Sequence, residues 1–375
     1  MKIGILGPLW HNIPPAKYGG TEDVVYNLAN GLVDNKHDVT LFGPKTAHVS
    51  AKVHATVDRP LREKGIPWTD SGYTLLHMTE AFDRADQFDI LHVHLNKVQD
   101  YAALPLALHS KTPVIFTLHF KIAGKEQKEK YDRYLLLQKY KHLPYVSISN
   151  TQRKSIDLRY IATVYNGIGL NRFHFSDRKG NYLVWLGKVA PFKGTKEAIR
   201  AAKKGNMKIY LMGTIERGVP ELSDYYDKEV KPLIDDKQVV WLGEVSYDEK
   251  ASIMSGAKAL LNPIAWEEPF GLVMVEAQAA GTPVISYRRG AAKELIRDGE
   301  TGFLVDSLDE MVEKITQVEH LDRRACRENI AQNFTIEKMV EGYERAYRDV
   351  IDNWETYRKE QLNLLNSKHK ITNNK

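Results

Sequence analysis

The chain has 375 residues, of which 43% are hydrophobic and 27% charged. This length is too great for one ordinary core and suits two α/β domains. No run of 18 or more apolar residues occurs, so no transmembrane helix is expected, and the N-terminus lacks the long apolar stretch of a signal peptide. The single cysteine, Cys326, excludes an internal disulfide, and a cytoplasmic location is therefore expected.

The net charge of +5 is modest. It fits a protein that binds phosphorylated ligands or visits an anionic membrane surface. Nucleic acid is not expected as a partner, because no basic motif studded with aromatic residues is present. Residues 121–142 hold seven Lys or Arg against three acidic residues. We interpret this segment as a solvated surface helix, with contact to anionic lipid as the alternative.

Short β-branched runs alternate along the chain with stretches of helical period, which predicts parallel sheets wound with helices. In the first half, strands are expected at 2–7, 38–42, 89–93, 113–118, 145–148 and 162–165. The pattern then restarts, with strands expected at 181–186, 207–212, 239–242, 259–262 and 283–286. The expected fold is therefore α/β with two Rossmann-like domains.

Glycine and asparagine cluster between the two halves, as a linker requires. The expected domains are 1–165 and 181–334, with a linker at 166–180. A helix is expected over 335–365 and a polar tail over 366–375. Five residues form the apolar stripe expected on that helix: Met339, Tyr343, Ala346, Val350 and Trp354.

The most informative stretch is 266–284, WEEPFGLVMVEAQAAGTPV. Pro269 suits the first turn of a helix, and the helix is expected to run from about Gly271 to Ala280. Its free N–H groups, near Phe270, Gly271 and Leu272, suit an anion such as a diphosphate. Eight residues at 100° each place Glu268 and Glu276 roughly on one side. The alternative is that Glu268 completes the helix start and Glu276 is a solvated helix residue.

Two other loops carry candidate ligand-binding residues. Gly187 ends a strand and opens the loop that holds Lys188 and Lys193, whose charges suit a diphosphate; the alternative is a pair of solvated loop lysines. Gly19 and Gly20 follow the first strand and let the backbone approach a ligand closely, although a plain turn before a helix is the alternative.

His119 stands at the expected carboxyl end of strand 113–118, where α/β sheets bind ligands. A lone histidine is more often a structural hydrogen-bonding group, but this position favours a functional one. His92 and His94 are interpreted either as packing residues or as residues on the acceptor side. Neither belongs to an expected metal site.

Several of these stretches together resemble glycosyltransferase family 4, whose members carry a Glu-x7-Glu motif. The resemblance covers Glu268-Pro-Phe-Gly-Leu, Glu276-Ala, Gly281-Thr-Pro-Val and the later 298–305, DGETGFLV, and its order and spacing extend from Gly19-Gly20 to the final helix. It implies the GT-B fold, in which two Rossmann-like domains face each other across a cleft and a C-terminal helix crosses back to the N-terminal domain.

The resemblance also implies an activity: a retaining, metal-independent transfer of a sugar from a nucleoside-diphosphate sugar to an acceptor hydroxyl, in glycan, glycolipid or glycoside biosynthesis. A UDP-sugar is favoured as donor, with GDP-mannose as the alternative, and no cofactor is expected. The chain holds no Asp-x-Asp, the usual metal-binding motif of the other glycosyltransferase fold. The N-terminal domain is expected to bind the acceptor and the C-terminal domain the donor.

Residue roles follow by the same resemblance. Glu268 contacts the donor sugar, Glu276 holds the ribose, and Lys193 with position 188 neutralises the diphosphate. Family members usually have arginine where this chain has Lys188, which keeps the charge but loses the two-pronged contact. Gly19 and Gly20 lie beside the donor phosphates, and His119 points at the reacting sugar.

Two alternatives to this function are weighed. One is another GT-B enzyme, such as a nucleotide-sugar epimerase, against which the Glu268–Glu276 segment and the Lys193 loop argue. The other is a non-catalytic subunit that binds a nucleotide sugar, against which the retained motif positions argue.

Overall fold

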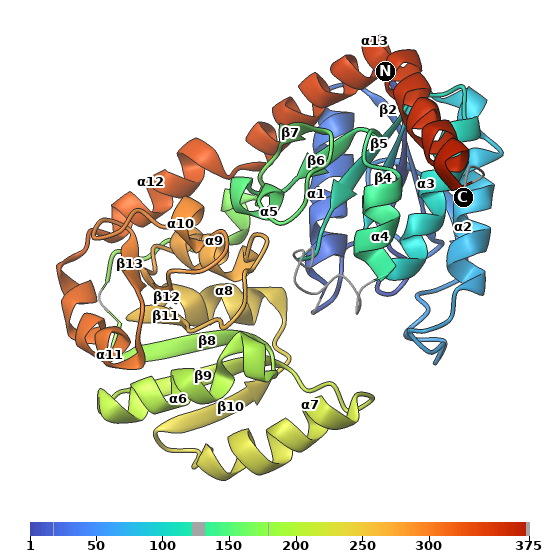
Figure 1. Ribbon diagram of the computed structural model, residues 1–375. Coiled ribbons are helices and arrows are strands. Elements are labelled where there is room, and N and C mark those ends of the chain that lie inside the picture. Colours follow the sequence, from blue (N-terminus) through green and yellow to red (C-terminus); the bar gives the residue numbers. More distant parts are fainter. Residues whose placement is uncertain (18, 122–131, 179, 373–375) are drawn as a thin grey trace. The chain divides into compact units, whose positions relative to one another are not determined.

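A computed structural model describes residues 1–17, 19–121, 132–178 and 180–372 (Figure 1). The chain forms two compact units. Unit 1 consists of described residues within Met1–Pro15, Gly19–Gly167 and Ile336–Lys375, and unit 2 of those within Ala16–Tyr18 and Ile168–Thr335.

Unit 1 is built on a parallel sheet. Among the described residues it has seven strands in the order β3-β2-β1-β4-β5-β6-β7. The strands are β1 (Lys2–Leu6), β2 (Asp38–Pro44), β3 (Lys52–Val57), β4 (Ile90–Leu95), β5 (Val114–Leu118), β6 (Tyr145–Ser147) and β7 (Tyr160–Thr163). Every residue of β4 and β5 is buried, because helices cover both faces of a parallel sheet.

The helices of unit 1 are α1 (Gly20–Asp34), α2 (Gly72–Phe82), α3 (Ala103–His109), α4 (Asp132–Lys139), α5 (Asn150–Arg153) and α13 (Ile336–Thr372). Helix α13, red in Figure 1, packs against α1, α3, β5 and β7. All five residues of its expected apolar stripe are buried. The helix continues past the expected end at 365, because the sequence there contains neither proline nor glycine to stop it.

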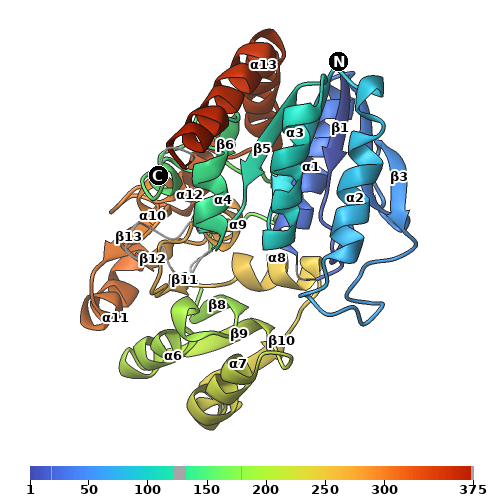
Figure 2. The ribbon, with the colours of Figure 1, turned by 45° about the vertical axis from the view of Figure 1, so that its right-hand side comes forward.

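Unit 2 repeats the arrangement with a sheet that has, in its described part, six strands in the order β10-β9-β8-β11-β12-β13. The strands are β8 (Tyr182–Lys188), β9 (Lys208–Thr214), β10 (Val239–Gly243), β11 (Ala259–Asn262), β12 (Val284–Tyr287) and β13 (Gly302–Val305). The helices are α6 (Thr195–Lys204), α7 (Pro220–Tyr225), α8 (Tyr247–Ser255), α9 (Leu272–Ala279), α10 (Ala292–Leu295), α11 (Leu308–Gln317) and α12 (Arg323–Asn333). Both views place α6 and α8 on opposite sides of β8 (Figure 2).

Unit 2 begins earlier than the expected second domain. Phe173 is buried, and the guanidinium of Arg327 on α12 donates to the carbonyl oxygens of Leu170 and Phe173 at 2.9 and 3.1 Å. The stretch that sequence composition marked as a linker is thus anchored to unit 2 from Ile168 onward.

Candidate active site

The order of strands in unit 2 marks one place for a ligand. Strands β8 and β11 are neighbours, but the chain leaves β8 toward β9 on one side and leaves β11 toward β12 on the other. Parallel sheets bind ligands outside the carboxyl ends of the strands at such a switch point. The loops that follow these two strands carry Lys193 and Glu268.

Lys193 and Glu268 form an ion pair, with Nζ of Lys193 donating to Oε2 of Glu268. The indole Nε1 of Trp266 donates to the same oxygen at 2.9 Å, and the Lys193 ammonium lies 5.1 Å from the centroid of the Trp266 ring. The side chain of Glu268 is only 13% exposed. Both of these contacts therefore use Oε2 of Glu268, and neither uses Oε1.

Backbone contacts fix the loop around Glu268. The N–H of Gly290 donates to Oε2 of Glu267 at 2.6 Å, and the N–H of Ala291 donates to the Glu268 carbonyl at 2.9 Å. Gly290 has φ of 54°, and a Cβ there would lie 2.3 Å from the Glu268 carbonyl oxygen. Only glycine permits this approach, which sets the direction of Glu268.

The start of α9 agrees with the sequence prediction to within one residue, except for the place of Pro269. Helix α9 begins at Leu272 with Gly271 as its N-cap, so Pro269 lies before the helix instead of in its first turn. Among the described residues no side chain caps this end. The Phe270 side chain is buried and packs edge-on against Phe334, so only its backbone is open to a ligand role.

Glu276 lies within α9 and is 5% exposed, so its interpretation as a solvated helix residue is wrong. Its Oε1 accepts from Nζ of Lys250 on α8 at 2.6 Å. Because Glu268 precedes the helix, the helical-wheel argument that put both glutamates on one side does not apply to it. The two glutamates thus form ion pairs with different lysines, Glu268 with Lys193 and Glu276 with Lys250.

Lys188 is the last residue of β8, and its Nζ lies 3.4 Å from Oε2 of Glu216. Gly187, beside it, pairs with Gly213 of β9. A Cβ on Gly213 would lie 1.8 Å from the Gly187 carbonyl oxygen, so position 213 requires glycine.

Unit 1 has its own switch point, between β1 and β4. Gly19 is the N-cap of α1 with φ of 153°, and Gly20 is the first residue of that helix. A Cβ on Gly19 would lie 2.7 Å from Cβ of Pro15 and 3.1 Å from Oε2 of Glu22. Burial raises the pKa of Glu22 to about 7.

A second carboxyl group follows β4, where the half-buried Asp100 accepts from the backbone N–H groups of Asn96 and Lys97 at 2.8 and 2.6 Å. Burial raises the pKa of Asp100 to about 6. Two side-chain carboxyl groups with raised pKa, those of Glu22 and Asp100, therefore lie at the C-terminal edge of this sheet.

Three histidines follow one another along β4 and the end of β5. His119 is the residue after β5, as expected, and its Nε2 lies 2.7 Å from Nδ1 of His94. His92 is different, because its nitrogens meet Tyr347 and Thr117, each at 2.8 Å, which makes it part of the packing of α13. Burial lowers the pKa of His119 to about 3 and the pKa of His92 and His94 well below the usual value.

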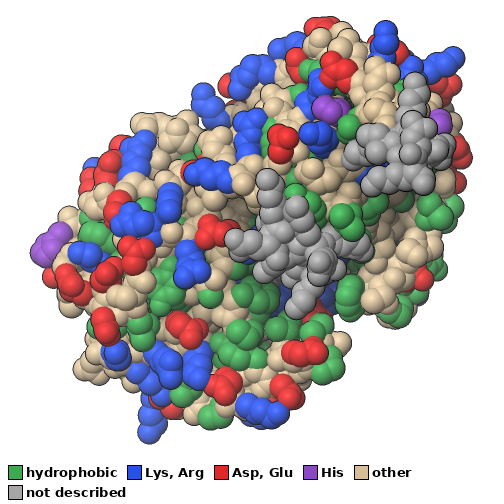
Figure 3. Space-filling model, viewed as in Figure 1, with side chains coloured by type: hydrophobic (Ala, Val, Ile, Leu, Met, Phe, Trp, Pro, Cys, Tyr) green, Lys and Arg blue, Asp and Glu red, His purple; other side chains and the backbone are tan. Residues whose placement is uncertain are grey.

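Within the described ranges, no group of three or more His, Cys, Asp or Glu is arranged to hold a metal ion. No helix in the described part of the chain is long and apolar enough to cross a membrane. Basic and acidic side chains are interspersed over the face shown in Figure 3. Residues 122–131 of the basic segment 121–142 lie outside the described residues, and its described part contains helix α4.

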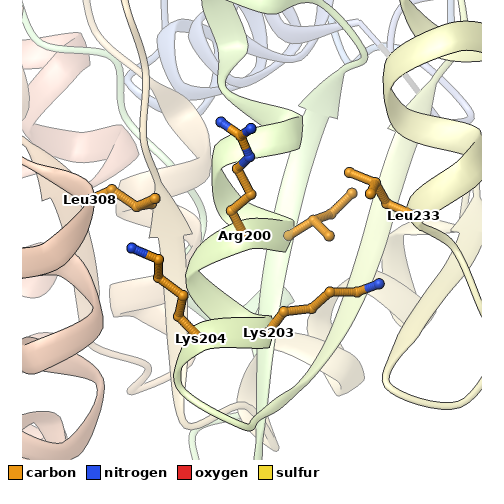
Figure 4. Close-up of a pocket in the computed structure, with 6 residues that line it drawn as sticks. Arg200, Lys203, Lys204, Leu233 and Leu308 are labelled. Atoms are coloured by element: carbon orange, nitrogen blue, oxygen red, sulfur yellow. The ribbon is translucent and has the colours of Figure 1, made fainter.

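A hollow of about 370 Å³ lies elsewhere on unit 2 (Figure 4). It is lined by Ile199, Arg200, Lys203, Lys204, Leu233 and Leu308. Its two lysines end α6, which runs back from the carboxyl edge of the sheet, so the hollow lies toward the opposite edge from Lys193. Each lysine already faces an aspartate, Asp235 at 3.8 Å or Asp309 at 2.8 Å.

Two family models match the chain. "Glycosyltransferase Family 4" covers residues 18–172, and "Glycosyl transferases group 1" covers residues 170–334. A phosphatidyl-myo-inositol mannosyltransferase of Mycolicibacterium smegmatis is 26% identical over 326 residues, which are 81% of each chain.

Solved structures with the same fold include two of known source. Sucrose-phosphate synthase from Thermosynechococcus elongatus gives a TM-score of 0.76 at 18% identity and covers 94% of this chain and 99% of its own. HepE of Anabaena, solved with UDP and glucose, gives 0.71 at 17% identity and covers 92% and 98%.

The two parallel-sheet units and these structural relatives show the GT-B fold, and the two family models make the protein a glycosyltransferase. By the two models that together span residues 18–334, the chain belongs to glycosyltransferase family 4. The family and fold expected from the sequence motifs are both confirmed.

Sequence reasoning missed the partners of the site residues. Lys250, Trp266 and Glu216 come from separate parts of unit 2 and meet the named residues only after folding. Lys250 lies in a helix of ordinary composition, so nothing local marks it. Gly213 could have been found from the sequence, because it is the next-to-last residue of β9, as Gly187 is of β8.

Proposed function

We propose that this glycosyltransferase transfers a sugar from a nucleoside-diphosphate sugar to an acceptor hydroxyl with retention of configuration and without a metal ion. The observation that carries the proposal is the Lys193–Glu268 pair at the switch point of unit 2, with Lys188, Glu276 and the start of α9 at the same edge of the sheet. A UDP-sugar is the favoured donor, which the UDP and UDP-glucose complexes of HepE support.

In the reaction, the acceptor oxygen forms a bond to the anomeric carbon while the bond from that carbon to the diphosphate oxygen breaks. The acceptor proton passes to the departing diphosphate, so charge on the leaving group must be stabilised. Lys193 and Lys188 supply that stabilisation, and the uncapped N-terminus of α9 adds to it. The protein otherwise positions the reactants.

The two glutamates divide the donor between them. Glu268 has Oε2 occupied by Lys193 and Trp266, and Oε1 accepts from a hydroxyl of the transferred sugar. Glu276 has Oε1 occupied by Lys250, and Oε2 accepts from the ribose hydroxyls. From unit 1, Gly19 and Gly20 approach the donor phosphates and His119 contacts the sugar. The products enter glycan, glycolipid or glycoside biosynthesis.

The test is a panel of UDP-glucose, UDP-galactose, UDP-N-acetylglucosamine and GDP-mannose, each incubated with the protein in water as acceptor. We expect one donor to raise the melting temperature and to release its nucleoside diphosphate, with the released sugar first appearing in the donor's own anomeric configuration by NMR. Glu268→Gln is the matched variant, because it keeps the size of the side chain and removes the charge. It should release less nucleoside diphosphate than wild type. A raised melting temperature without release of nucleoside diphosphate would favour the non-catalytic subunit. A released sugar of the opposite anomeric configuration would refute the retaining mechanism.

A further inference from the structure

His94 and His119 form a close pair at the carboxyl edge of the unit 1 sheet. The Nδ1 of His94 lies 2.7 Å from Nε2 of His119, and the two rings are stacked at 25° with centroids 5.0 Å apart. His94 is 3% exposed on β4, and His119, which follows β5, is half-buried. The backbone N–H of His119 also donates to the carbonyl of Leu95 at 3.0 Å, which fixes the two strand ends together.

Both rings are neutral at physiological pH, because burial lowers the pKa of His119 to about 3 and the pKa of His94 well below its usual value. A neutral imidazole has one N–H and one bare nitrogen. One proton therefore lies in the bond between the rings, and it belongs either to His94 or to His119.

The far nitrogen of His94 decides between these cases. Its Nε2 is buried and has no hydrogen-bond partner among the described residues. If His119 were the donor, Nε2 of His94 would carry the proton and leave a buried N–H unpaired. If His94 is the donor, Nε2 is a bare nitrogen. Among buried backbone groups, an N–H without a partner is rarer than an acceptor without one. By the same argument, a bare Nε2 on His94 is favoured over an unpaired N–H.

We propose that His94 is a positioning residue for His119: it donates from Nδ1 to Nε2 of His119 and so holds the His119 proton on Nδ1. His119 then presents Nδ1–H, a neutral hydrogen-bond donor, to its ligand. That this ligand is an oxygen of the transferred sugar rests on the proposed function, but the tautomer does not.

The matched control is His92, a buried histidine on the same strand. Its Nδ1 meets the hydroxyl of Tyr347 and its Nε2 the hydroxyl of Thr117, and its ring centroid lies 4.1 Å from that of His94. A substitution there therefore disturbs the packing of α13 and of the His94 ring but removes no hydrogen bond to His119. A merely structural role for His94 would make variants at the two positions behave alike.

The experiment reads the protonated nitrogen of His119 directly, by long-range ¹H–¹⁵N NMR of the ¹⁵N-labelled full chain. Wild type and His92→Asn should show His119 with its proton on Nδ1. In His94→Asn the side-chain amide lies near the place of Nδ1, and His119 should keep its proton on Nδ1. In His94→Gln the amide lies near the place of Nε2, and the His119 proton should no longer be fixed on Nδ1. In His94→Leu the two tautomers should exchange.

The second readout is the release of UDP from UDP-glucose. His94→Leu and His94→Gln should lower kcat about tenfold with little change in KM, the size expected when one hydrogen bond is lost, and His94→Asn should recover most of it. If UDP-glucose is not hydrolysed but the NMR result holds, the positioning role stands and the donor assignment falls. A wild-type proton on Nε2 of His119, or identical His119 spectra in His94→Asn and His94→Gln, would overturn the proposal.

Discussion

Lys250 on α8 and Glu276 on α9 form an ion pair that is almost closed to solvent. Their charged atoms lie 2.6 Å apart, and the side chains are 13% and 7% exposed. The Lys250 ammonium also lies 4.0 Å from the centroid of the Tyr247 ring. A buried pair of this kind adds little over an apolar one, but removing one partner leaves the other charge uncompensated. In the absence of ligand, the charge of the Glu276 carboxylate is therefore compensated by Lys250.

Lys250→Met should lower the free energy of unfolding by on the order of 3 kcal/mol, because Glu276 is left charged and buried. Urea denaturation measures the change. The control is Lys228→Met, which breaks the exposed pair of Lys228 and Asp224 and should leave stability nearly unchanged. Equal effects at the two lysines would show that burial of the pair does not matter.

Variants of the two glutamates should differ in their affinity for the free product, UDP. UDP contains the ribose but not the transferred sugar. Glu276→Ala should therefore weaken UDP binding by roughly 1.5–3 kcal/mol, the size of one charged hydrogen bond, while Glu268→Ala should lower turnover and spare UDP affinity. Isothermal titration calorimetry with UDP resolves the difference. If both variants lose UDP affinity alike, the assigned division of roles is wrong.

Lys193→Ala should reduce kcat by on the order of 10²–10³, the usual cost of removing one electrostatic contact to a developing charge. The far-UV circular dichroism spectrum should not change. Lys204→Ala serves as the control, because Lys204 is exposed on α6 and pairs with Asp309 instead of a site residue. An unchanged kcat in Lys193→Ala would make Lys193 an ordinary loop lysine.

Much of the fold follows from local pattern. The run at 259–262 matches β11, and the strongly apolar β4 and β5 were found within two residues, because a strand buried on both faces is apolar throughout. Strand β3 was missed, since it lies at the edge of its sheet with largely exposed residues such as Lys52. Strand β13, at the edge of the other sheet, was also missed.

The site was predictable where a motif marks it and not where folding brings partners together. Lys193 and Glu268 were named from their motifs, but their ion pair joins positions 75 residues apart in the chain. The contact of His94 with His119 spans 25 residues and depends on the pairing of β4 with β5. The expected helix start at about Gly271 agrees with α9 to within one residue, but Pro269 lies before the helix, because proline also suits the bend that precedes Gly271.

Turnover should survive excess chelator. The lysines of unit 2 are assigned the role that a divalent cation plays in other sugar transfers. Release of the nucleoside diphosphate is measured with the chosen donor before and after dialysis against EDTA, and again after addition of Mg²⁺ or Mn²⁺. Activity that is lost with EDTA and restored by either ion would contradict the assignment of Lys188 and Lys193.

The buried carboxyl of Glu22 should make unit 1 less stable as the pH rises toward and above neutrality. Burial raises its pKa from 4.5 to about 7, and the charges of Lys97, Asp100 and Asp23 act on it as well. The folded state therefore binds this proton more tightly than the unfolded state does. Between pH 4.5 and 7 the folded state holds the extra proton, so the free energy of unfolding falls as pH rises through that window.

Glu22→Gln, which cannot ionise, should thus be more stable than wild type above pH 7, by up to about 3 kcal/mol. The difference should shrink as the pH falls and vanish well below pH 4.5, where the Glu22 carboxyl is protonated in both the folded and the unfolded state. Urea denaturation at pH 5, 6.5 and 8.5 measures it, with the exposed Glu63→Gln as the control that should show no such trend. A Glu22→Gln variant that is less stable than wild type at pH 8.5 would mean that the carboxylate has a favourable partner when charged.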